Sequence, residues 1–263
     1  AGTGKTLLTY DIAKDSMNQG FKVCIIHCGM LNDGHMMLRR EYGWYIMPIK
    51  SWGHIEYNEC HLIIIDETQR IRPPQLERII IKILENKCNC IFSYDAEQCL
   101  RKGEINNKIT DYILGKYPLK YELTKKIRTN KEIASFTSLL FNKSSPEKIY
   151  NEGNVELIYL QSHEAVKLFL QQRSNDGWKI INYTESKDRN PYDNFIINNE
   201  INAHEVIGQE FDNVLAVIDQ YFYYEGARLK TRGYPQYPYY HPTKMLFQII
   251  TRTRKKLCVI ILN

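Results

Sequence analysis

The segment Leu62-Ile63-Ile64-Ile65-Asp66-Glu67 is an apolar run that ends in two acids. A strand that is apolar on both faces is typical of a parallel sheet with helices on each side. Further short strands are predicted at residues 22–28, 89–95, 155–159, 178–183, 214–218 and 257–262. Helical patterns alternate with these strands, and this alternation predicts an α/β fold with a mainly parallel sheet.

The first predicted helix covers residues 7–18, and its spacing places Leu7, Leu8, Ile12 and Ala13 toward a core. Other helices are predicted at residues 31–42, 73–85, 104–116, 130–142, 162–172 and 244–253. A short strand at residues 121–124 is expected to end the first half of the chain. We therefore place a domain boundary near residue 125, which gives domains at 1–124 and 125–263.

The chain opens with Ala1-Gly2-Thr3-Gly4-Lys5-Thr6, the second half of the phosphate-binding pattern G-x-x-x-x-G-K-[ST]. Small residues at Gly2, Thr3 and Gly4 let backbone N–H groups surround phosphates at the start of the following helix. In this pattern Lys5 reaches the β- and γ-phosphates, and the Thr6 hydroxyl binds Mg²⁺. The alternative is a flexible terminus with an N-capping threonine. Because a strand normally precedes such a loop, we expect a fragment of a longer protein that lacks this first strand.

Polar residues follow two of the predicted strands. In a phosphate-loop fold, Asp66 at a strand end holds Mg²⁺, and Glu67 orients and deprotonates the attacking water. Gln98 lies just past the next strand, where an amide can hydrogen-bond the γ-phosphate or its water. The alternative for Asp66 and Glu67 is a strand followed by a polar turn, and the alternative for Gln98 is an ordinary loop amide. Together with the phosphate loop, these residues predict ATP hydrolysis with Mg²⁺ as the cofactor.

An ordered series of motifs resembles the core of a superfamily 1 helicase, and within it the Schlafen-type (group 3-like) bacterial DNA/RNA helicase domain family. The motifs are the phosphate loop and residues 66–70, 95–98, 123–130, 204–212 and 250–254. They extend over nearly the whole chain. The resemblance implies two RecA-like P-loop NTPase domains with ATP between them, acting as an ATP-dependent helicase or single-strand translocase.

The resemblance also implies roles for residues of the second domain. Arg128 would face the γ-phosphate, and Arg252 would be an arginine finger that stabilises transition-state charge. Gly208 and Glu210 resemble the motif that binds the nucleotide ribose, and His204 resembles a histidine near the nucleic-acid path. The alternatives are a surface residue near the hinge for Arg128 and a helix-end cation for Arg252. For Glu210 the alternative is a solvated acid, and for His204 it is a structural histidine.

Three positions depart from the family pattern. Ala203 stands where Thr is usual, Ile207 where Gln or Lys is usual, and Ser93 where many relatives have Gly. The first two lie where such proteins couple nucleotide to nucleic acid. Two alternatives therefore stay open: an ATP-gated regulatory switch that binds nucleic acid without separating strands, and an inactive scaffold fragment.

Residues 221–240 contain seven of the nineteen tyrosines and are expected to form a long loop, an insertion at about 219–243. Bases stack on aromatic rings and cations contact phosphates, so Arg228 and Lys230 are candidate nucleic-acid contacts. The alternative is an insertion that packs its tyrosines on the second domain.

The composition is that of an ordinary globular protein, with 43% hydrophobic and 25% charged residues. A net charge of +5 permits single-stranded DNA or RNA as a partner without choosing between them. No apolar run approaches the roughly 18 residues of a membrane span, and no signal peptide is visible. The seven cysteines include no C-x-x-C pair, which favours reduced thiols in a cytoplasmic protein. Additional domains of the same longer chain are expected.

Overall fold

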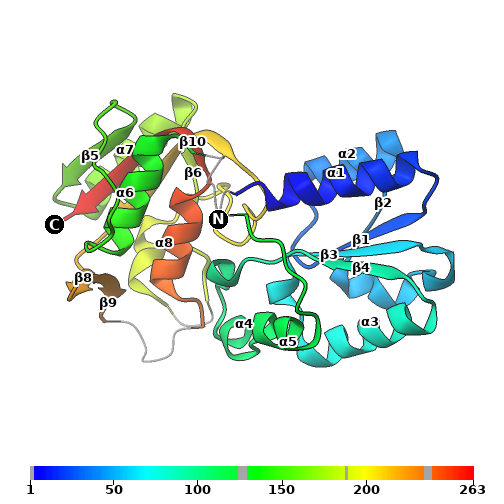
Figure 1. Cartoon of the computed structure of the whole chain (residues 1–263). Coiled ribbons are helices and arrows are strands. Elements are labelled where there is room, and N and C mark those ends of the chain that lie inside the picture. The colour runs from blue at the N-terminus through cyan, green and yellow to red at the C-terminus, as the bar shows by residue number, and fades with distance from the viewer. Residues whose placement is uncertain (1–2, 124–128, 187–188, 234–238) are drawn as a thin grey trace. The chain divides into compact units, whose positions relative to one another are not determined.

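A computed structural model of the chain describes residues 3–123, 129–186, 189–233 and 239–263. The chain divides into two units, whose elements are drawn in Figure 1. The first unit runs from Thr3 to Cys99 and resumes at Gly103, and the second contains Leu100–Lys102 and the rest of the chain's C-terminal half. Each unit has a sheet of four parallel strands, which confirms the predicted fold class.

The first sheet has the strand order β2-β1-β3-β4. Its strands are β1 (Val23–His27), β2 (Tyr45–Pro48), β3 (Leu62–Asp66) and β4 (Asn89–Phe92). Its main helices are α1 (Lys5–Asn18), α2 (Asp33–Tyr42) and α3 (Pro73–Glu85). Ile63 and Ile65 pack with residues of α3 on one face, and Ile64 packs with Ala13 of α1 on the other. Both central strands are therefore buried along their whole length, as their apolar sequences predict.

Three expectations for the first unit are wrong. Leu7 and Leu8 are exposed, at 65% and 38%, because the buried face of α1 carries Thr9 and Ala13, which are one helical turn apart. The helix expected at 104–116 is two helices, α4 (Lys102–Asn106) and α5 (Ile109–Lys116), with a left-handed φ of 46° at Lys108 between them. Residues 121–123 form no strand.

The start of α2 is held by a reciprocal cap. The Asn32 side-chain oxygen accepts the backbone N–H of His35 at 3.1 Å, and Nδ1 of His35 accepts the backbone N–H of Asn32 at 3.0 Å. His35 is only 4% exposed. Burial lowers its pKa to about 4, with a further contribution from His27.

Acidification is therefore expected to destabilise the chain through His35. Its folded pKa lies below the unfolded value of about 6.5, so the unfolded state takes up the proton first. The contribution of neutral His35 to the free energy of unfolding is complete when the pH is above that unfolded pKa. It is lost as the pH falls toward 4, and the loss is at most about 3 kcal/mol. Urea unfolding between pH 7 and pH 4.5 measures it. His35→Gln keeps a capping acceptor that does not titrate, so equal pH dependence in both proteins would contradict the prediction.

The second sheet has the strand order β5-β10-β7-β6. Its strands are β5 (Val155–Leu160), β6 (Lys179–Ile180), β7 (Phe211–Ile218) and β10 (Thr253–Leu262). Its main helices are α6 (Lys131–Phe141), α7 (His163–Asn175) and α8 (Pro242–Ile250). Val259 and Ile260 of β10 are fully buried, and the core of this unit forms around them. The helix expected to reach residue 253 instead ends at Ile250, because β10 begins at Thr253.

The tyrosine-rich segment is not the expected long loop where the structure describes it. Strands β8 (Phe222–Glu225) and β9 (Arg228–Thr231) form an antiparallel hairpin. Phe222 and Tyr224 pack against the core, and the Tyr224 hydroxyl donates to the carbonyl of Leu140 at 2.8 Å. The hairpin is thus attached through two of its aromatic rings. Residues 234–238 lie outside the described residues.

Two other expectations can be compared with the structure. None of the seven cysteines is in a disulfide; five of them are buried and two are half-buried. Among the residues that the structure describes, no helix has both the length and the apolar character needed to cross a membrane.

Candidate functional site

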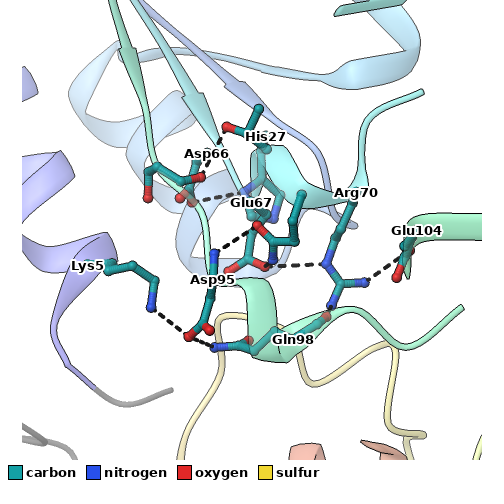
Figure 2. Close-up of polar contacts among 11 residues, drawn as sticks. Lys5, His27, Asp66, Glu67, Arg70, Asp95, Gln98 and Glu104 are labelled. Carbon is teal, nitrogen blue, oxygen red and sulfur yellow. Dashed lines mark hydrogen bonds and ion pairs between the residues drawn. The ribbon is translucent and has the colours of Figure 1, made fainter. Parts of the chain in front are cut away.

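Polar side chains gather at the carboxyl ends of β3 and β4 in the first unit, beside the start of α1 (Figure 2). Nζ of Lys5 lies 2.8 Å from Oδ2 of Asp95. The Gln98 side-chain amide donates to the same oxygen at 3.0 Å. Carboxyl ends of parallel strands meet at one edge of a sheet, which is where α/β proteins bind ligands. Lys5 and Gln98, predicted from separate motifs, are thus brought together.

The start of α1 has the backbone that a phosphate loop needs. Gly4 precedes the helix with a left-handed φ of 83°, a conformation that favours glycine. Gly4 has no side chain with which to cap the helix, and the N–H groups at a helix N-terminus attract anions. Lys5 and Thr6 are its first two residues. Gly2 lies outside the described residues, and Thr3 directly precedes Gly4.

Asp66 is 2% exposed at the end of β3, where the His27 ring contacts its carboxylate. Nδ1 of His27 lies 3.2 Å from its Oδ2, and Ser93 directly follows β4, the strand on the other side of β3. Burial alone would raise the pKa of Asp66, but the bonds from His27 and Ser93 and the charge of His27 lower it below its ordinary value. The Asp66 carboxylate is therefore ionised and suited to a hard cation.

Glu67 is held by two neighbours. Its Oε2 accepts a hydrogen bond from the Gln69 amide at 2.8 Å and lies 3.3 Å from Nε of Arg70. The Arg70 guanidinium also donates to the Gln98 carbonyl at 3.0 Å and lies 3.8 Å from Glu104. Glu67 has a left-handed φ of 55°, which is rare for a residue with a side chain and concentrates at functional sites.

Gln69 connects the two halves of this cluster. Its side-chain oxygen accepts the backbone N–H of Asp95 at 3.1 Å, while its nitrogen donates to Glu67. Gln69 is 1% exposed. A continuous series of polar contacts therefore runs from Lys5 through Asp95 and Gln69 to Glu67.

The donor set fits Mg²⁺ bound together with a phosphate ligand. Mg²⁺ keeps several waters and uses one or two carboxylates plus substrate phosphates rather than a cage of protein ligands. Thr6 and the ionised Asp66 are donors of that kind. Among the described residues, no cluster of three or more His, Cys, Asp or Glu side chains could hold a metal ion by itself.

Sequence reasoning gave no role to His27, Gln69, Arg70 or Asp95. Gln69, Arg70 and Asp95 lie within the motifs quoted above, but their side-chain partners come from distant segments. His27 ends an apolar strand, as Asp66 does. A polar residue at the carboxyl end of a predicted parallel strand was the available signal.

The second unit places Arg252 beside the segment that resembles a ribose-binding motif. Arg252 is 1% exposed, and its Nη1 donates to the Gln209 carbonyl at 3.4 Å. Gly208 has a left-handed φ of 79°, and Glu210 is exposed. Arg128 lies outside the described residues.

His204 belongs to an aromatic group in the second unit. Its Nδ1 lies 2.7 Å from the Thr184 hydroxyl, and its ring centroid lies 4.4 Å from that of Tyr240. The Tyr239 ring packs edge-on against Tyr240 at 4.7 Å, and the Arg101 guanidinium lies 5.8 Å from the Tyr240 centroid. The group offers rings and a cation on one unit.

The other two predicted nucleic-acid contacts belong to a different element. Arg228 and Lys230 lie on β9 of the hairpin, and both are exposed. Lys230 forms an ion pair with Glu225 on the opposite strand. The pairing offsets one of the two positive charges on this strand.

No family model and no curated protein matches the chain. Two solved structures of the arterivirus helicase, nonstructural protein 10, are similar to it. One is the protein alone, at 12% identity, and the other is its complex with DNA, at 11% identity; both have a TM-score of 0.53. Each match covers 98% of this chain and 57% of the helicase chain, so this chain spans little more than half of that length. The likeness shows the fold: two RecA-like domains, as in a helicase.

Proposed function

We propose that the chain is the ATP-driven motor core of a Schlafen-type DNA or RNA helicase or single-strand translocase. The observation that carries the proposal is the meeting of Lys5, Asp95 and Gln98 at the sheet edge that also holds Asp66 and Glu67. The helicase-like fold supports it. One phosphate-binding cation, one metal-binding acid and one candidate base are the parts that phosphoryl transfer to water requires.

The contacts of the site define what each side chain would do. Lys5 would exchange Asp95 for the β- and γ-phosphates, and Thr6 and Asp66 would hold Mg²⁺, which neutralises phosphate charge when bound. Glu67 would turn from Arg70 to accept a proton from the attacking water. Arg252 and Arg128 are proposed to stabilise the charge of the transition state, and Gly208 and Glu210 to bind the ribose.

Asp95→Asn is expected to tighten ATP binding roughly fivefold, about 1 kcal/mol. The substitution removes the anion that competes with phosphate for Lys5, and it keeps a group that Gln98 can still contact. Titration with a fluorescent ATP analogue measures the affinity. Asp111→Asn, at an exposed position of α5, is the matched control. Unchanged or weaker binding by Asp95→Asn alone would show that Asp95 does not compete with nucleotide.

The aromatic group around His204 is the proposed contact for a single strand. Tyr239 is 59% exposed, so its ring is available for a base to stack on, and Arg101 is exposed beside it. One helicase of similar fold is known in complex with DNA. For this chain the partner is proposed to be single-stranded DNA or RNA.

Steady-state ATP hydrolysis with and without single-stranded DNA or RNA tests the proposed function. We expect either DNA or RNA to stimulate ATP hydrolysis, and we expect a Glu67→Gln protein to show no such stimulation. The nucleic acid that stimulates hydrolysis is the one along which the protein moves. Turnover that neither strand changes would contradict a nucleic-acid-driven motor.

A second candidate is an ATP-gated switch that binds nucleic acid without separating strands. Ala203 and Ile207 stand where related proteins couple nucleotide to nucleic acid, and both are buried, at 0% and 3% exposure. Apolar side chains in that position contact the interior of the unit rather than a strand. Strand displacement on a tailed duplex separates the candidates, because a switch would hydrolyse ATP without displacement.

A further inference from the structure

We propose that His27 and Ser93 are positioning residues that orient the Asp66 carboxylate toward the metal ion of bound nucleotide. The inference rests on the proposed function, and it assigns work to two residues that no motif assigns. Neither residue would touch the metal or the nucleotide. Both would act through Asp66.

The backbone of the sheet places the two residues on either side of Asp66. In the pairing of β1 with β3, His27 lies directly opposite Asp66, and the Cys28 N–H donates to the Asp66 carbonyl at 3.0 Å. On the other side, the Ser93 N–H continues the pairing with β3 by donating to the Ile65 carbonyl at 2.9 Å. The places of His27 and Ser93 on either side of Asp66 are therefore set by strand register.

The His27 ring is fixed by its surroundings. Its side chain is 1% exposed, and the His35 ring packs on it with centroids 4.4 Å apart. Tyr10 in turn packs edge-on against His35 at 6.2 Å. A carboxylate oxygen accepts hydrogen bonds, so Nδ1 of His27 is assigned as the donor in this pair. Figure 2 shows this side chain meeting Asp66 from the side away from Lys5.

A histidine here is costly unless it has a role. Its Nε2 is buried and has no hydrogen-bond partner within the part of the chain that the structure describes. An apolar residue would end β1 without that penalty. A histidine that fixes a carboxylate beside a metal gives a reason for its presence, because such outer partners typically change metal affinity or activity by about 10- to 100-fold.

Two substitutions at residue 27 separate hydrogen bonding from packing. His27→Leu has similar bulk and no donor, while His27→Asn can place an amide N–H near the position of Nδ1. Ser93→Ala removes the hydroxyl that is proposed to orient Asp66, at little cost in volume. Binding of Mn²⁺, followed by electron paramagnetic resonance with a non-hydrolysable ATP analogue, reads the metal site without turnover. The Mg²⁺ concentration for half-maximal hydrolysis and the melting temperature without metal are measured alongside.

His27→Leu is expected to weaken Mn²⁺ binding by about 10- to 100-fold, and Ser93→Ala by a smaller factor. His27→Asn is expected to stay within about threefold of the unchanged chain despite the cavity it creates. Unchanged Mn²⁺ affinity in His27→Leu, or an equal loss of affinity in His27→Leu and His27→Asn, would overturn the inference and leave the proposed function standing. An unsubstituted chain that binds no metal with nucleotide would overturn the proposed function and, with it, the inference.

Discussion

Lys5→Ala is expected to abolish ATP hydrolysis, with turnover falling by at least about 100-fold. The Lys5 ammonium lies at the start of α1 and forms an ion pair with Asp95. A phosphate that binds there would replace Asp95 as its partner. Without it, developing charge on the phosphates loses its nearest compensation. Turnover and nucleotide affinity are measured together, and both are expected to fall.

Lys14→Ala is the control for this substitution, because Lys14 lies on the same helix and is exposed. It removes an equal charge and an equal side chain from a position outside the site. Full activity in Lys5→Ala would remove the phosphate-loop assignment. Equal loss in both variants would point to general destabilisation of α1 instead.

Glu67→Gln is expected to lower turnover by about 100- to 10,000-fold while ATP still binds. The amide keeps the shape of the side chain and its bond to Gln69, but it cannot take up a proton from water. Arg70 contacts the same oxygen, Oε2, so the substitution removes the charge of the Glu67–Arg70 ion pair while an amide oxygen can still accept from Arg70. Single-turnover hydrolysis and nucleotide titration measure the two properties separately.

The exposed Glu85→Gln variant controls for the loss of one negative charge in the same unit. Retained turnover in Glu67→Gln would exclude the residue as the base. Loss of ATP binding together with turnover would instead indicate that the Glu67–Arg70 pair shapes the site.

The strands of both sheets, apart from β2 at Tyr45–Pro48, were predicted from local sequence. The run at 62–66 is apolar on both faces, and such a segment is stable only under helices on both sides. The hairpin β8–β9 was not predicted because its residues mix aromatic and charged types without regular alternation. The exposure of Leu7 and Leu8 depends on which face of α1 meets the sheet, and that is decided by packing.

The site was predictable in part for the same reason. Lys5, Asp66, Glu67 and Gln98 each follow from a local pattern, and the structure gathers them in one unit. The contact between His27 and Asp66 became visible only with the strand register, which pairs these residues although they are 39 positions apart. No local pattern contains that information. The roles of Arg128, Arg252 and Glu210 stay predictions.

The amide of Gln69 couples the position of Asp95 to the position of Glu67. One end of this buried side chain holds the backbone at Asp95, and the other holds the carboxylate of Glu67. A displacement of Asp95 when Lys5 leaves it would therefore pull on the group that is proposed to activate water. These contacts would set the order of events: Glu67 would be released to act as the base only after a phosphate has bound to Lys5. Hydrolysis by a site that is not fully occupied would thereby be limited.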